Sequence, residues 1–132
     1  MVASVLAPLL VLTGAFGFAL PSRWALLSGA PAYNLFHGVA GMAGIWLVIR
    51  FGARGAVAFN LGFGLVDLYQ VLAGLVGLFP AALFVYRPLD DVLHVVLGLG
   101  LVGLGVLGHG PGVTAARGER DPAPGRPRDR VI

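Results

Sequence analysis

Four long apolar segments, separated by short polar or proline-containing stretches, dominate the pattern of this 132-residue chain. A helix that spans a bilayer needs about 20 mostly apolar residues. The segments cover about residues 2–20, 33–51, 56–79 and 89–108, and none alternates as a barrel strand would. Backbone groups in lipid must be bonded within their own segment. The pattern therefore predicts an all-α fold, a bundle of four transmembrane helices.

The composition agrees with a lipid environment. Hydrophobic residues make up 58% of the chain and charged residues 11%, whereas soluble domains have about 25% charged residues. So few charges could not cover a soluble fold, so we expect residues 1–109 to form one domain with the lipid bilayer as its main partner. The chain has no cysteine, which excludes disulfides, thiolate metal sites and cysteine nucleophiles.

The C-terminal segment, residues 110–132, has a different character. It is rich in proline, glycine and charge and has few large apolar groups, so we expect a disordered basic tail. The first apolar segment lacks the positively charged start of a signal peptide, so we expect it to be retained.

The arginines predict the orientation of the helices. With four spans, the side shared by both termini and the middle loop carries Arg50, Arg54, Arg117, Arg120, Arg126, Arg128 and Arg130. The opposite side carries only Arg23 and Arg87. Positive residues concentrate in cytoplasmic loops, so both termini are predicted to be cytoplasmic.

Polar residues stand at matching positions where the second and fourth segments begin. Asn34 and His37 open the second, and Asp90, Asp91 and His94 open the fourth. Residues three apart share a helix face, which pairs Asn34 with His37 and Asp91 with His94. Either aspartate also suits the N-terminus of a helix. Both segments start on the outer side, so these five residues are predicted to form one interhelical polar cluster there.

Glycines indicate which way the histidines face. Gly41 and Gly44 follow His37 along one stripe, and Gly98 and Gly105 follow His94. Glycine lets membrane helices approach closely. We therefore expect the histidines to face protein, on second and fourth helices that touch.

The third segment carries polar residues of its own: Asn60, Asp67 and Gln70. Asp67 is predicted near the bilayer midplane, where a charged side chain costs about 2.5–3.5 kcal/mol on insertion scales. We expect it to face the interior, either as a neutral acid or with a polar partner. It should lie about seven residues, roughly 10 Å, below the level of the histidines.

The stretches "YNLFHGVAGMAGI", "RFGARGAVAFNLGFGLVDLYQVLAGLVG" and "DDVLHVVLGLGLVGLG" resemble an uncharacterised bacterial family of four-helix membrane proteins, domain of unknown function 4383. The resemblance covers about residues 10–108. Asn34, His37, Asp90 or Asp91, and His94 occupy the positions of its motifs. It implies a bacterial inner-membrane protein and brings no activity with it.

Three interpretations of the polar residues remain open. The first is a structural clasp, hydrogen-bonded between the second and fourth helices. The second is a haem held by His37 and His94, or a divalent metal held by the two histidines with Asp90 or Asp91. Two histidines alone support a metal weakly, and His109, on the other side, could not join them. The third is a proton or small-solute relay.

Other functions find little support in the sequence. It has no phosphate-binding loop, no serine–histidine–acid pattern and no nucleic-acid motif, so neither an enzyme nor a nucleic-acid partner is expected. No cofactor is expected unless the haem or metal interpretation holds. A homo-oligomer or a larger membrane complex is compatible with the pattern.

Overall fold

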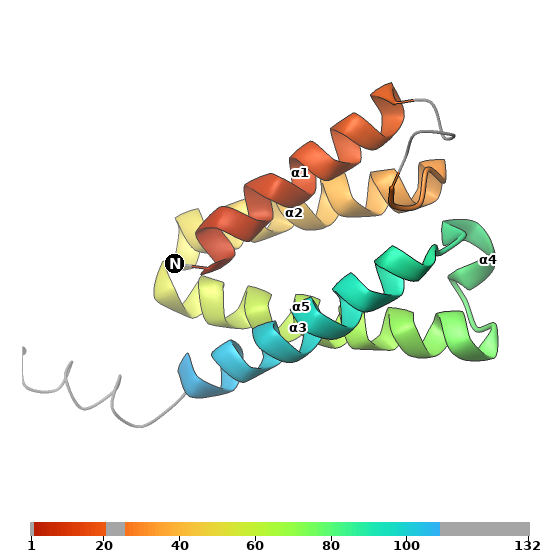
Figure 1. The fold of residues 1–132 in the computed structure, drawn as a ribbon. Coiled ribbons are helices and arrows are strands. Elements are labelled where there is room, and N and C mark those ends of the chain that lie inside the picture. The colour runs from red at the N-terminus through yellow and green to blue at the C-terminus, as the bar shows by residue number, and fades with distance from the viewer. Residues whose placement is uncertain (1, 21–25, 109–132) are drawn as a thin grey trace, which may run out of the picture.

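The computed structural model describes residues 2–20 and 26–108, which are helical and contain no strand (Figure 1). The helices are α1 (Val2–Ala19), α2 (Pro31–Phe51), α3 (Ala53–Val76), α4 (Ala81–Phe84) and α5 (Pro88–Gly108). All except α4 are long and apolar enough to cross a membrane, which confirms the predicted fold class. Residues 110–132, Arg23 and His109 lie outside the described residues.

The third long helix begins and ends three residues earlier than predicted. Gly77 ends it in the left-handed conformation (φ 71°), where its N–H bonds to the carbonyl of Ala73. Leu78 also donates to the Ala73 carbonyl, at 3.0 Å. This is the pattern of a glycine-terminated helix. The predicted end at residue 79 relied on Pro80 and overlooked this glycine, so Asp67 lies closer to the end of its helix than expected.

The long helices form two antiparallel hairpins, α1 with α2 and α3 with α5 (Figure 1). Glycines allow the close approach within each hairpin. A Cβ on Gly41 of α2 would lie 2.6 Å from the carbonyl oxygen of Ala7 in α1. A Cβ on Gly64 of α3 would lie 2.9 Å from the Cβ of Leu101 in α5. Each hairpin therefore depends on glycine at its contact.

The second and fourth long helices, α2 and α5, touch near their first turns, where the Tyr33 hydroxyl donates to Asp90. The four glycines below the histidines are buried as expected, but they mark different contacts. Gly41 meets Ala7 and Val11 of α1, and Gly98 meets Leu68 of α3. The glycine stripes therefore serve the pairings within the two hairpins and not the contact between α2 and α5.

The hairpins are joined at both ends of the bundle. At one end only Gly52 separates α2 from α3, and its backbone angles (φ 58°, ψ −130°) lie in a region that favours glycine. At the other end, α4 and its flanking residues connect α3 to α5 and contact α2. Below, the "turn end" means the Gly52 end and the "loop end" means the α4 end.

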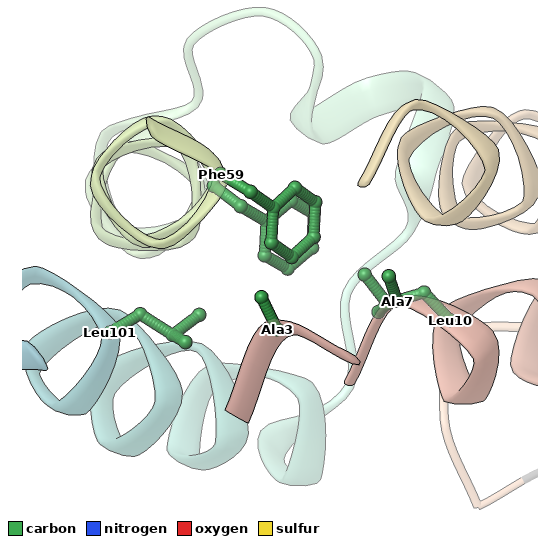
Figure 2. Close-up of a cluster of buried hydrophobic side chains, with 6 residues drawn as sticks. Ala3, Ala7, Leu10, Phe59 and Leu101 are labelled. Carbon is green, nitrogen blue, oxygen red and sulfur yellow. The ribbon is translucent and has the colours of Figure 1, made fainter. Parts of the chain in front are cut away.

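An apolar core fills the half of the bundle nearer the turn end (Figure 2). Aromatic rings run through it, with Phe59 and Phe63 nearly parallel at a centroid distance of 5.4 Å. Phe63 in turn stacks on Phe36 of α2 at 6.3 Å. The buried side chains of this core are Ala3, Ala7, Leu10, Phe59, Phe63 and Leu101.

Large apolar side chains also cover the outside of the bundle. Ile49, Leu75 and Leu107 are 80%, 77% and 77% exposed. An apolar surface on this scale is unusual for a protein in water and normal for one in lipid. The fold is that of a small multi-pass membrane protein.

Candidate functional site

Most of the polar residues singled out from the sequence are buried. Asp91 is partly buried, and the others are all less than a tenth exposed: Asn34, His37, Asn60, Asp67, Gln70, Asp90 and His94. Asn60 lies within the apolar half, and its side-chain oxygen has no hydrogen-bond partner. The remaining residues gather toward the loop end, in two layers that differ in their hydrogen bonding.

The outer layer is centred on Asp90, which is 0% exposed. Its carboxylate accepts a hydrogen bond from the Tyr33 hydroxyl at 2.8 Å. It also accepts from the backbone N–H of Ser28 at 2.9 Å and from that of Arg87 at 2.8 Å. These donors belong to α2, to the connection before α2 and to the residue before α5. One carboxylate thus joins three segments at the loop end.

The local sequence explains how Asp90 reaches this position. Pro88 begins α5, and Asp91 donates its N–H to the carbonyl of Arg87 at 3.3 Å. Proline suits the first position of a helix because its missing N–H would have no partner there. Asp90 is then the third helical residue, from which an acidic side chain can reach back to the N–H of the capping residue.

Sequence reasoning missed Ser28 and Tyr33. Ser28 donates its hydroxyl to the carbonyl of Phe84, which ties the α1–α2 connection to α4. Its oxygen also accepts from the N–H of Ala30 at 3.2 Å. Tyr33 lies one helical turn before His37, and this i, i+4 spacing was the available signal. Below, the outer layer means Ser28, Tyr33 and Asp90.

The Tyr33 ring lies close to both histidines. Its centroid lies 4.1 Å from that of His37 and 6.2 Å from that of His94, so the two imidazoles lie within about 10 Å of each other. His37 Nδ1 bonds to the carbonyl oxygen of Tyr33 at 2.9 Å. The histidines are therefore neighbours, and neither nitrogen of His94 has a hydrogen-bond partner.

The residues that form these hydrogen bonds differ from those predicted for the clasp. Asp90 joins segments as expected, but no hydrogen-bond partner is found for the Asn34 amide nitrogen, Asp91 Oδ1 or either nitrogen of His94. Asn34 turns toward α1, where a Cβ on Gly17 would meet its side chain. Asn34 therefore faces α1, whereas Tyr33, the residue before it, makes the contact with Asp90 of α5.

The inner layer consists of Asp67, Gln70 and His94. Glycine contacts give the register of α3 against α5: Gly74 lies opposite Asp91, and Gly98 contacts Leu68. His94 is therefore level with the residue after Gln70, and Asp67 lies about one turn deeper. The expected separation of roughly 10 Å between Asp67 and the histidine level was too large, because α3 ends earlier than predicted.

Polar atoms of the inner layer lack partners. Both oxygens of Asp67, the amide nitrogen of Gln70 and both ring nitrogens of His94 are buried without a hydrogen bond. Asp67 and Gln70 are each 1% exposed, and His94 is 3% exposed. Asp67 lies within electrostatic range of the Tyr33 hydroxyl, so the two layers adjoin. Buried polar groups are normally hydrogen-bonded, and exceptions call for an explanation.

Tyr86, between α4 and α5, covers the inner layer at the loop end. Its hydroxyl donates to Gln70 Oε1 at 3.3 Å, and its ring meets that of His94 edge-on at 5.7 Å. The ring also lies against Gly74 of α3. Burial, with a smaller effect from the charge of Asp91, raises the pKa of Tyr86 to about 12. The phenol therefore remains a hydrogen-bond donor at neutral pH.

The arrangement offers little for a metal or a large cofactor. Within the described ranges, no group of three or more His, Asp or Glu side chains is placed to hold a metal ion. A groove of about 570 Å³ runs between α1, α2 and α5, but its walls are mostly apolar and neither histidine lines it. Comparison of the chain with protein-family models, curated proteins and solved structures found no match.

Proposed function

We propose that the outer layer is a structural clasp that holds the two hairpins together at the loop end of a small, non-enzymatic membrane protein. The observation that carries this proposal is the fully buried carboxylate of Asp90, bonded to Ser28, Tyr33 and Arg87. A carboxylate with several donors is held firmly, and removing it leaves those donors buried and unpaired. The clasp supports assembly of the bundle and involves no reaction.

Distances between spin labels test the clasp, because the chain has no cysteine and labelled positions can be introduced singly. One label pair reports the loop end, at the exposed residues Leu35 of α2 and Val92 of α5. A control pair reports the turn end, at Ile49 and Val106, which are also exposed. We expect Asp90→Asn to broaden the distance distribution of the first pair only. Unchanged distributions at both ends would refute the clasp.

The proposed location is the bacterial inner membrane, with both termini in the cytoplasm. The bacterial location rests on the resemblance to the family of unknown function, and the orientation rests on the arginines. Arg54, near the turn end, and Phe79, at the loop end, are both exposed. A single cysteine can replace either residue for labelling. A membrane-impermeant maleimide added to intact cells should label position 79 and spare position 54. The reverse pattern would contradict the orientation.

Reversible proton binding by the inner layer is a second candidate function. The unpartnered Asp67 and His94 favour it, because intramembrane acids and histidines are the usual parts of proton relays. Transport of a larger solute has less support, since the polar atoms of this layer are buried and adjoin no described groove.

The haem and metal interpretation finds no support in the geometry. Axial ligation requires two imidazoles that face one iron from opposite sides, and neither histidine lines a described groove. We expect the purified protein to show no Soret band and no stoichiometric metal. Either signal would revive this interpretation.

A further inference from the structure

Five polar atoms without partners belong to three buried residues of the paired helices α3 and α5. They are Asp67 Oδ1 and Oδ2, Gln70 Nε2, and His94 Nδ1 and Nε2. A buried polar atom without a partner makes the folded state less favourable, so such atoms are rare in native structures. Their concentration on facing helices, beside a fully bonded outer layer, indicates a role other than stability.

The burial of these atoms restricts what they can bind. The five atoms are buried, and their residues line none of the described grooves. A metal ion would need additional ligands, and no sufficient group is present among the described residues. A proton needs no cavity, and carboxyl and imidazole groups are side chains that exchange protons.

Ionisable groups in the loop-end half of the bundle come from several elements. Helix α2 contributes Tyr33 and His37, the residues before α5 contribute Tyr86 and Arg87, and α5 itself contributes Asp90, Asp91 and His94. On helix α3, Tyr69 is exposed and bonds to the carbonyl of Phe79. Helix α1 has no ionisable side chain between Val2 and Ala19. Of these groups, the Tyr33 hydroxyl lies within electrostatic range of Asp67.

The inner layer is closed in different ways at its two ends. Toward the turn end, the stacked rings of Phe36, Phe63 and Phe59 and the apolar core close the bundle, with Asn60 as a buried polar side chain in that half. Toward the loop end, Tyr86 covers the inner layer through ring contacts and one long hydrogen bond of 3.3 Å to Gln70. Tyr86 is itself only partly buried, so a rotation of its side chain would admit water at this end alone.

We propose that Asp67, together with Gln70 and His94, is a proton-binding site that exchanges protons only with the loop end, past Tyr86 as its gate. This inference rests on proton binding as the second candidate function and adds the route and its direction. A proton from water at the loop end joins the Asp67 carboxylate and later returns to the same side. No net charge crosses the membrane, so the site senses pH and does not conduct.

Infrared spectroscopy of the full-length protein in lipid vesicles tests the site. A protonated carboxyl group has its own carbonyl band, which is followed as pH is varied and then as deuterium replaces hydrogen. We expect a pH-dependent band that is absent in Asp67→Asn and present in Asp91→Asn. If Asp67→Asn leaves every pH-dependent carboxyl band in place, Asp67 binds no exchangeable proton, and both this site and the second candidate function fail.

The rate of deuterium exchange at that band tests the gate separately. Tyr86→Phe keeps the ring and removes the hydrogen bond to Gln70, so exchange should become about tenfold faster, the factor that corresponds to one hydrogen bond. Tyr69→Phe is the matched control and should leave the rate unchanged. A rate insensitive to both Tyr86→Phe and Tyr86→Ala would overturn the gate while leaving proton binding intact.

The same vesicles under a pH gradient test whether protons exchange with the loop end alone. We expect proton flux no greater than in protein-free vesicles, for the native chain and for Tyr86→Phe alike. A flux that Asp67→Asn abolishes would overturn the one-sided site and favour a relay across the membrane.

Discussion

The outer and inner layers lie about one helical turn apart in the same bundle, yet they satisfy their polar groups very differently. Asp90 holds hydrogen bonds from three segments, whereas both oxygens of Asp67 have none. Each side chain is almost completely buried. Burial of a carboxyl group therefore does not by itself reveal its role in this protein. The partners separate a residue that stabilises the fold from one that is free to change its protonation state.

The difference follows from where the chain leaves its helices. The outer layer lies beside the connections, where the N–H groups of Ser28 and Arg87 are not used within a helix and can donate to Asp90. The inner layer lies between helix interiors, whose backbone groups are already bonded. Side chains there can bond only to other side chains, as Tyr86 does when its hydroxyl donates to Gln70 Oε1.

The largest effect is expected for Asp90→Ala. Removing the carboxylate leaves three buried donors unpaired, so the free energy of unfolding in detergent should fall by about 3–5 kcal/mol. Asp91→Ala is the control at the neighbouring position, and it should change the free energy of unfolding by less than about 1 kcal/mol. Similar losses for both variants would contradict the special role given to Asp90.

A smaller effect is expected for Tyr33→Phe, which removes one hydrogen bond from the outer layer and keeps the aromatic ring beside the histidines. The free energy of unfolding should fall by about 1–2 kcal/mol. Tyr69→Phe removes the exposed bond to the carbonyl of Phe79 and should have little effect. Equal results for the two tyrosines would argue that the clasp does not depend on Tyr33.

Two glycine substitutions in α3 test the packing of the α3–α5 hairpin, which carries the inner layer. A Cβ on Gly64 would press against Leu101 and Val102 of α5, whereas one on Gly62, in the same helix, would meet nothing within 4 Å. Gly64→Ala should therefore lower the free energy of unfolding by about 1 kcal/mol or more. Gly62→Ala should be neutral or stabilising, because alanine favours a helix. Thermal unfolding of the two variants side by side decides this.

Much of the fold could be predicted from the sequence, because a spanning helix requires a long apolar run. The ends of α3 were harder to predict from the sequence, because Gly77 and Pro80 can each end a helix. The structure shows that α3 ends at Gly77. The helices that pack against the glycine stripes were not predicted either. Glycine stripes indicate that a face is packed, but they do not identify the helix that packs there.

The site was predictable in part. Asp90, His37 and His94 stood out because a polar residue in an apolar run needs a partner. Ser28 did not, because its role depends on a backbone N–H in a connection, and such groups occur at every loop. Tyr33 was missed because a tyrosine near a membrane surface usually needs no special explanation.

The same substitution at two positions tests the central claim most directly. Aspartate to asparagine keeps the shape and removes the charge, so Asp67→Asn and Asp90→Asn can be compared by the free energy of unfolding in one detergent. We predict a loss of about 2 kcal/mol or more at position 90, where an amide NH₂ would face donors, and a change below about 0.5 kcal/mol at position 67, where no bond is lost. Equal losses at the two positions, or a larger loss at position 67, would contradict the division into a structural outer layer and an unpartnered inner layer.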